Sequence, residues 1–144
     1  MTFRLLIICK GNICRSPMAE TMLRHRLGRD DIVVESAGLA AMQGSPVDPK
    51  AQQVLLEHGL SAAAHIGRQA TRELLQRFDL VLAMEQRQVA ATLASCPVLR
   101  GRVLMFSHWN GGEDIDDPYG RDISCFDATY DSLDTCNSEW QTKL

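Results

Sequence analysis

Short apolar runs alternate with amphipathic stretches along the whole chain, and this alternation predicts strands separated by helices. Buried strands are predicted at 3–9, 32–36, 79–84 and 102–106. Helices are predicted at 17–27, 48–58, 72–78, 85–96 and over the residues between Arg121 and Trp140. Strands that are apolar on both faces are typical of a parallel sheet covered by helices on both sides. The pattern therefore predicts one doubly wound α/β domain over residues 1–144.

The junction between the first strand and the first helix carries clear local signals. Ser16 is the predicted N-cap of that helix, and Pro17 is its predicted first residue. In open α/β sheets, ligands bind beyond the carboxyl ends of the strands. Because Cys9 ends the first strand, the candidate site is expected at Cys9 and the residues that follow it.

Composition excludes several classes of function. The chain has 144 residues, 45% of them hydrophobic, which suits one domain with one sizeable core. A net charge of -3 argues against a general nucleic-acid binder. No apolar stretch approaches membrane-spanning length, so no membrane insertion is expected.

The five cysteines are an odd number, and no secretory apolar segment precedes them. No Cys-x-x-Cys pair or Cys/His spacing indicates a metal site. The expected protein is cytoplasmic, with reduced thiols.

The string CKGNICRSP, residues 9–17, joins the first strand to the first helix and has the properties of an anion-binding loop. Gly11 and Asn12 tolerate positive φ angles, so successive backbone N–H groups can point inward around an anion. The helix start adds its positive end, and Arg15 offers a planar fork that matches two phosphate oxygens. A cysteine in such surroundings ionises readily, which makes Cys9 the candidate nucleophile.

A second candidate lies late in the chain, in the sequence Asp117-Pro118-Tyr119. Pro118 holds the preceding residue in an extended backbone. One carboxylic acid there could protonate a leaving group and later activate water, and Tyr119 offers an aromatic wall for a substrate ring. Asp117 is therefore the candidate general acid.

These motifs resemble the low-molecular-weight protein tyrosine phosphatase family along nearly the whole chain. The matching segments are 8–17, Ser36-Ala37-Gly38, His65 with Arg68-Gln69, 79–84 and Asp117-Pro118-Tyr119. The resemblance implies a four-stranded parallel sheet in the order 2-1-3-4. It also implies hydrolysis of phosphotyrosine on proteins through a phosphocysteine intermediate, without metal or other cofactor.

The resemblance assigns roles residue by residue. Cys9 attacks phosphorus, Arg15 binds the equatorial oxygens, and Asp117 is the acid. Ser16 hydrogen-bonds the Cys9 sulfur, while Asn12 holds the unusual loop backbone, tied to Ser36 and His65. The expected phosphate- and substrate-binding residues are Lys10, Gly11, Asn12, Ile13, Cys14, Ser16 and Tyr119.

Within the family, Leu39, Ala40 and His108-Trp109 resemble bacterial members that act on tyrosine kinases of capsule and exopolysaccharide export. The expected partner is a phosphotyrosine protein substrate of that kind, a tyrosine autokinase. Lys10, at the expected rim of the cleft, either is a solvated side chain or selects acidic residues beside phosphotyrosine. Trp109 is either a packing residue or part of the cleft.

The same residues argue against other functions. A thioredoxin-coupled arsenate reductase needs two further cysteines in mid-chain, where only Cys96 stands. A non-catalytic phosphotyrosine-binding module would not need Cys9, Arg15 and Asp117 together. A redox protein would leave Arg15 and Asp117 unexplained, although Cys14 could still form a protective disulfide with Cys9, or simply pack beneath the loop.

Overall fold

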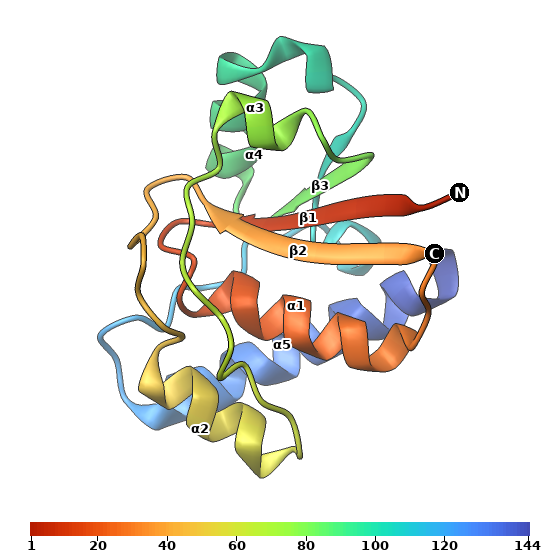
Figure 1. The fold of residues 1–144 in the computed structure, drawn as a ribbon. Coiled ribbons are helices and arrows are strands. Elements are labelled where there is room, and N and C mark those ends of the chain that lie inside the picture. The colour runs from red at the N-terminus through yellow and green to blue at the C-terminus, as the bar shows by residue number, and fades with distance from the viewer.

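The computed structural model describes all residues, 1–144, and its centre is a four-stranded parallel sheet. The strands are β1 (Phe3–Cys9), β2 (Ile32–Gly38), β3 (Leu80–Ala83) and β4 (Val103–Met105). Their order is β2-β1-β3-β4, as predicted. Because all pairs are parallel, the carboxyl ends of the strands lie at one edge, on the left of Figure 1.

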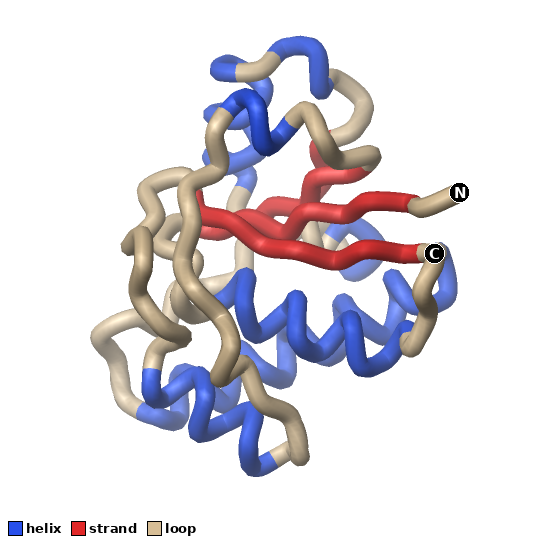
Figure 2. The backbone as a smooth tube through the Cα atoms, viewed as in Figure 1, coloured by secondary structure: helices blue, strands red, loops and turns tan.

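Helices cover both faces of the sheet, as the apolar strands predicted. On one face lie α1 (Arg15–Leu27), α2 (Pro49–Glu57) and α5 (Ile123–Lys143). On the other lie α3 (Arg72–Leu75) and α4 (Gln86–Ser95), shown above the sheet in Figures 1 and 2. Short 3₁₀ turns at Pro97–Leu99 and His108–Asn110 complete the chain. No helix combines the length and the hydropathy that a membrane crossing needs.

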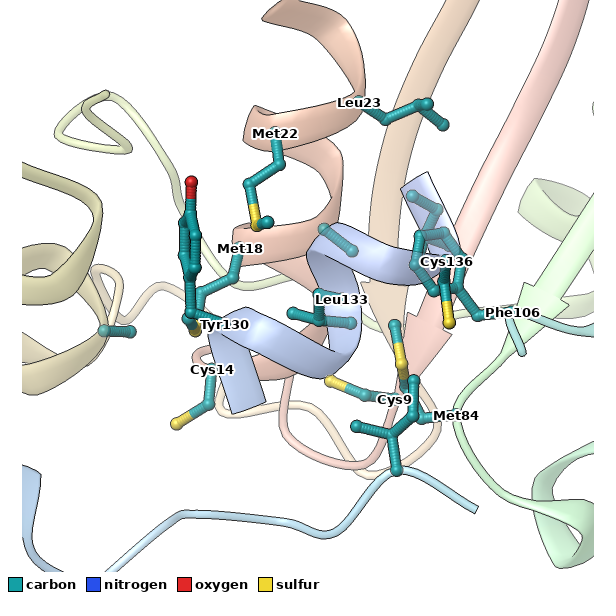
Figure 3. Close-up of a cluster of buried hydrophobic side chains, with 14 of the residues drawn as sticks. Cys9, Cys14, Met18, Met22, Leu23, Met84, Phe106, Tyr130, Leu133 and Cys136 are labelled. Atoms are coloured by element: carbon teal, nitrogen blue, oxygen red, sulfur yellow. The ribbon is translucent and has the colours of Figure 1, made fainter. Parts of the chain in front are cut away.

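The central strand β1 divides two hydrophobic cores by the alternation of its side chains. Leu5 and Ile7 belong to the core under α1, α2 and α5, whereas Leu6 and Ile8 belong to the core under α3 and α4. All four are fully buried. Figure 3 shows the larger core, where side chains of α1 meet those of α5. Among its labelled members, Met18, Met22 and Leu23 come from α1, and Tyr130, Leu133 and Cys136 come from α5.

Three local predictions were wrong. Helix α1 begins at Arg15 with Cys14 as its N-cap, so Ser16 does not cap it; the Ser16 hydroxyl instead contacts the Cys9 sulfur. Strand β2 continues to Gly38, where it still pairs with β1. Helix α3 is shorter than the predicted 72–78, because the chain turns out of it after Leu75.

Candidate active site

The segment between β1 and α1 curls into a loop whose shape depends on Asn12. Asn12 has φ 58°, the only positive φ among the non-glycine residues. Its side chain supports this backbone, because Asn12 Oδ1 accepts from the Arg68 N–H at 3.0 Å. Its carbonyl oxygen lies 2.6 Å from His65 Nε2. Of the two residues predicted to tolerate positive φ, only Asn12 adopts it; Gly11 does not.

Gly38, at the end of β2, lets the loop approach the sheet edge closely. A Cβ at this position would lie 2.6 Å from the Lys10 carbonyl oxygen and 3.0 Å from the Asn12 nitrogen. Both are backbone atoms of the loop, which cannot rotate away as a side chain could. The absence of a side chain at Gly38 is therefore a condition for the loop's position.

The Cys9 sulfur stands at the end of a chain of hydrogen bonds. The sulfur is 2.9 Å from Ser16 Oγ and accepts from the Asn12 N–H at 3.3 Å. The side-chain Nδ2 of Asn12 donates to Ser16 Oγ at 2.8 Å and to Ser36 Oγ at 3.0 Å. The Ser36 hydroxyl in turn donates to Glu20. Since Ser16 Oγ already accepts from Asn12, its own proton is available to the sulfur. The network can thus stabilise negative charge on Cys9.

Arg15 is almost fully buried, at 1% exposure. Its Nη1 donates to Glu85 Oε2 at 2.6 Å and to the Ile115 carbonyl at 2.7 Å, while its Nε is buried without a partner. Glu85 also binds Arg87 Nε at 2.6 Å. Burial opposes ionisation of Glu85, but the hydrogen bonds and charges of Arg15 and Arg87 outweigh it and hold the pKa of Glu85 below its usual value. The guanidinium is held in place through Nη1, while Nε has no partner.

Glu85 is one of two residues of the site that the sequence did not indicate. It was placed only at the start of a predicted helix, and it caps α4 in the structure. Its position shortly after β3 could have indicated a role in the site, because ligands bind beyond the carboxyl ends of the strands. Met42 was missed as well, because nothing in its loop indicated that it lines the site.

The loop and the acid segment enclose one cavity of about 140 Å³. It brings together most of the predicted site residues: Cys9, Lys10, Gly11, Ile13, Cys14, Arg15, Asp117 and Tyr119, with Ala40 and Met42. Asn12, Ser16, Ser36 and His65 lie outside it, in the supporting network. Trp109 is not among the lining residues; it packs edge-on against Trp140. The sequence-predicted site residues thus divide into a lining set and a supporting set.

Asp117 and Tyr119 line the cavity from the segment that precedes α5. Asp117 Oδ2 is 3.5 Å from Arg15 Nη2, and Oδ1 accepts from the Tyr119 N–H at 3.1 Å. Its side chain is 38% exposed, so water can reach it. Tyr119 is half exposed and forms part of the wall.

Cys14 lines the same cavity as Cys9 but differs from it chemically. Burial, with a smaller contribution from the charge of Asp48, raises the pKa of the Cys14 thiol far above its ordinary value. Cys14 therefore stays protonated at neutral pH and is no competitor for the nucleophile. All five cysteines are free, and no group of three or more His, Cys, Asp or Glu side chains could hold a metal ion.

The arrangement suits transfer of a phosphoryl group. A thiol supported by hydroxyl and backbone donors faces a buried arginine with a free N–H, and a carboxyl group lies within the same small cavity. Such donors act on charge that develops at the phosphoryl oxygens in the transition state.

Comparison with known proteins agrees with this geometry. A model of the low molecular weight phosphotyrosine protein phosphatase family matches residues 4–144. The low molecular weight protein-tyrosine-phosphatase Wzb of Escherichia coli (strain K12) is 40% identical over 140 residues, which are 97% of this chain and 94% of that protein. The solved structure of Vibrio vulnificus Wzb in complex with benzylphosphonate has a TM-score of 0.94 at 34% identity, covering 100% of both chains.

Another protein of similar structure has a different activity. The YwlE arginine phosphatase from Geobacillus stearothermophilus has a TM-score of 0.92 at 32% identity, over 98% of this chain and 92% of that one. The fold alone therefore does not distinguish these substrates. The family model and the curated relatives do identify the class: this chain belongs to the low molecular weight phosphotyrosine protein phosphatases and is a protein-tyrosine-phosphatase.

Proposed function

We propose that Cys9, Arg15 and Asp117 hydrolyse phosphotyrosine on proteins through a phosphocysteine intermediate. The observation that carries the proposal is the single cavity in which these three side chains meet. Its volume of about 140 Å³ suits a phosphorylated ring entering from the protein surface rather than a large free ligand.

In the first step, the Cys9 thiolate attacks phosphorus and the bond to the tyrosine oxygen breaks. The Ser16 hydroxyl and the Asn12 N–H support the thiolate. The free Nε of Arg15 and the loop N–H groups bind the phosphoryl oxygens. Asp117, protonated, gives its proton to the departing phenolate.

In the second step, the Asp117 carboxylate takes a proton from water, and the resulting hydroxide attacks phosphorus. The bond between sulfur and phosphorus breaks, which releases inorganic phosphate and restores the thiolate. Ser16 eases this departure, because its hydroxyl proton is directed to the sulfur by the bond that it accepts from Asn12.

The substrate that we propose is a bacterial tyrosine kinase of capsule or exopolysaccharide export, dephosphorylated in the cytoplasm. Curated relatives from Escherichia coli and Erwinia amylovora support a bacterial branch. Five free cysteines fit a reducing compartment.

Phosphoarginine is the second candidate, because one neighbour is described as an arginine phosphatase. The lining of the cavity favours phosphotyrosine. Ile13, Met42 and Tyr119 offer apolar and aromatic surface to a phenyl ring, whereas a guanidinium group would leave its donors facing these side chains.

The test is hydrolysis of matched peptides that carry phosphotyrosine, phosphoserine, phosphothreonine or phosphoarginine, in EDTA. We expect phosphotyrosine to react by far the fastest. Cys9→Ser should abolish turnover while anion binding persists, and phosphorus NMR of quenched wild-type reactions should detect a thiophosphate signal that the variant lacks. Full activity of Cys9→Ser would refute the mechanism, and faster hydrolysis of phosphoarginine would refute the substrate.

A further inference from the structure

A second groove adjoins the catalytic cavity. It has a volume of about 380 Å³ and is lined by Lys10, Leu39, Arg87, Gln88 and Ala91. Lys10 lines both the groove and the catalytic cavity, so the two hollows are neighbours on either side of that residue. No acidic side chain lines the groove.

The two cations of the groove are not neutralised there. Lys10 is exposed and takes part in no ion pair. Arg87 binds Glu85 only through Nε, which leaves both terminal nitrogens free on a side chain that is 77% exposed. Glu85 is itself shared with Arg15, whose Nη1 binds the other carboxylate oxygen. The groove therefore presents the unpaired charge of Lys10 and the two free terminal nitrogens of Arg87 toward solvent.

Arg87 is fixed at a defined place beside the catalytic centre. Glu85 is buried and bridges Arg15 and Arg87, each at 2.6 Å. One carboxylate thus separates the arginine proposed to hold the phosphoryl group from the arginine of the groove. Leu39 and Ala91 supply apolar surface in the same groove, against which the aliphatic part of a side chain can lie.

We propose that this groove is a second anion subsite, which binds an acidic or phosphorylated residue next to the phosphotyrosine of the substrate. The proposal rests on the proposed function, since it requires a phosphotyrosine peptide in the catalytic cavity. The shared chemistry is a group of anionic oxygens, either the carboxylate of Asp or Glu or a second phosphate. Lys10 and Arg87 bind it, and Arg87 can do so with both terminal nitrogens.

The experiment compares three sets of phosphotyrosine peptides, with Gln, Glu or phosphoserine at each of the two positions on either side of phosphotyrosine. The readout is the ratio of kcat/KM between charged and Gln peptides, so that general changes in rate cancel. An exposed ion pair changes kcat/KM by up to about fivefold, and two cations line the groove, so at the best position we expect a preference of about threefold to tenfold. The preference should shrink as NaCl is raised toward 1 M.

The variants are Lys10→Met and Arg87→Met, singly and together, with Arg100→Met as the matched control. Arg100 is exposed and follows the 3₁₀ turn before β4, at the opposite end of the sheet. Each groove variant should reduce the preference, and the double variant should remove it. Lys10→Glu combined with Arg87→Met should reverse it, so that a peptide with Lys beside phosphotyrosine reacts faster than one with Glu.

The outcomes separate the proposals. The subsite would be overturned if the parent protein had the same kcat/KM for charged and Gln peptides. It would also be overturned if the preference persisted in the double variant or was lost in Arg100→Met. Failure to hydrolyse even the Gln peptide would instead overturn the proposed function. A preference for phosphoserine without one for Glu assigns the subsite to a second phosphate, and a preference for both assigns it to anionic side chains in general.

Discussion

The carboxyl group of Asp117 is held in the cavity by two contacts and is also open to water. One of its oxygens accepts from the Tyr119 N–H, and the other lies 3.5 Å from Arg15 Nη2. Its partial exposure gives water access to the same carboxyl group. A single side chain can therefore serve both steps of the proposed reaction.

We expect Asp117→Asn to slow aryl phosphates with poor leaving groups by about 10²- to 10⁴-fold, because an amide cannot donate the proton that they need. Substrates with good leaving groups should lose much less. The measurement is kcat/KM across a series of substituted phenyl phosphates. Asp116→Asn, a change at an exposed neighbour, is the control and should not show this dependence on the leaving group. An equal loss for all substrates in Asp117→Asn would remove this residue from the donor role.

Cys14 is a candidate partner for Cys9 in a disulfide, because both cysteines line the same cavity. Peroxide converts a thiolate to a sulfenic acid, and a second thiol then displaces water to form a disulfide. We expect Cys9 to be oxidised first and Cys14 to form the disulfide. Burial raises the pKa of Cys14, so little of its thiolate is present at neutral pH. The thiolate fraction increases as pH rises, and the formation of the disulfide should therefore accelerate with pH.

The comparison is recovery of activity by a thiol reductant after peroxide treatment. The parent protein should recover most of its activity, whereas Cys14→Ser should lose it permanently through overoxidation of Cys9. Cys96→Ser is the control, because Cys96 is buried in the other core, and it should recover like the parent. Equal recovery in Cys14→Ser, with no internal disulfide detected by mass spectrometry, would show that Cys14 gives no protection.

At the scale of elements, the loop between β1 and α1 depends on contacts that are far apart in sequence. Gly38 of β2 touches its backbone, and Arg68 and His65 bond to Asn12. The loop's own sequence indicated anion binding, because its glycine, asparagine and arginine are contiguous. Glu85 was not predictable in the same way, since it contacts Arg15 across 70 positions of sequence.

We expect Gly38→Ala to displace the loop, since the added methyl would meet two backbone atoms within 3.0 Å. Such overpacking costs about 1–3 kcal/mol of stability, and the loss of kcat should exceed the loss expected from stability alone because the loop positions Cys9. Thermal unfolding and kcat/KM measure the two effects.

Gly11→Ala is the matched comparison within the loop. Its added methyl would meet only side-chain atoms, at 3.7 Å or more, and Gly11 does not have positive φ. We expect a smaller loss than in Gly38→Ala. If the two variants behaved alike, close approach at Gly38 would not be the reason for the loop's position.

At the scale of the whole molecule, the pattern of apolar runs predicted the layers well. All four strands and the two helix-covered faces follow from runs that are apolar on both sides. The ends of helices were less predictable where a residue of the site does not follow its usual preference for a capping position. Ser16, a good capping residue by type, bonds to Cys9 instead, because burial beside the sulfur offers it a different partner.

The unpartnered Nε of Arg15 links the chemistry of the site to the thermodynamics of folding. A buried donor without an acceptor costs the folded state about 1–3 kcal/mol, and an oxyanion bound to it, as the proposed mechanism requires, would recover that cost. Inorganic phosphate is then a ligand of the native state as well as the product of the reaction. At ten times its dissociation constant it would add about 1.4 kcal/mol to the free energy of unfolding. The enzyme's resistance to heat and its inhibition by its own product are thus two measures of one binding equilibrium.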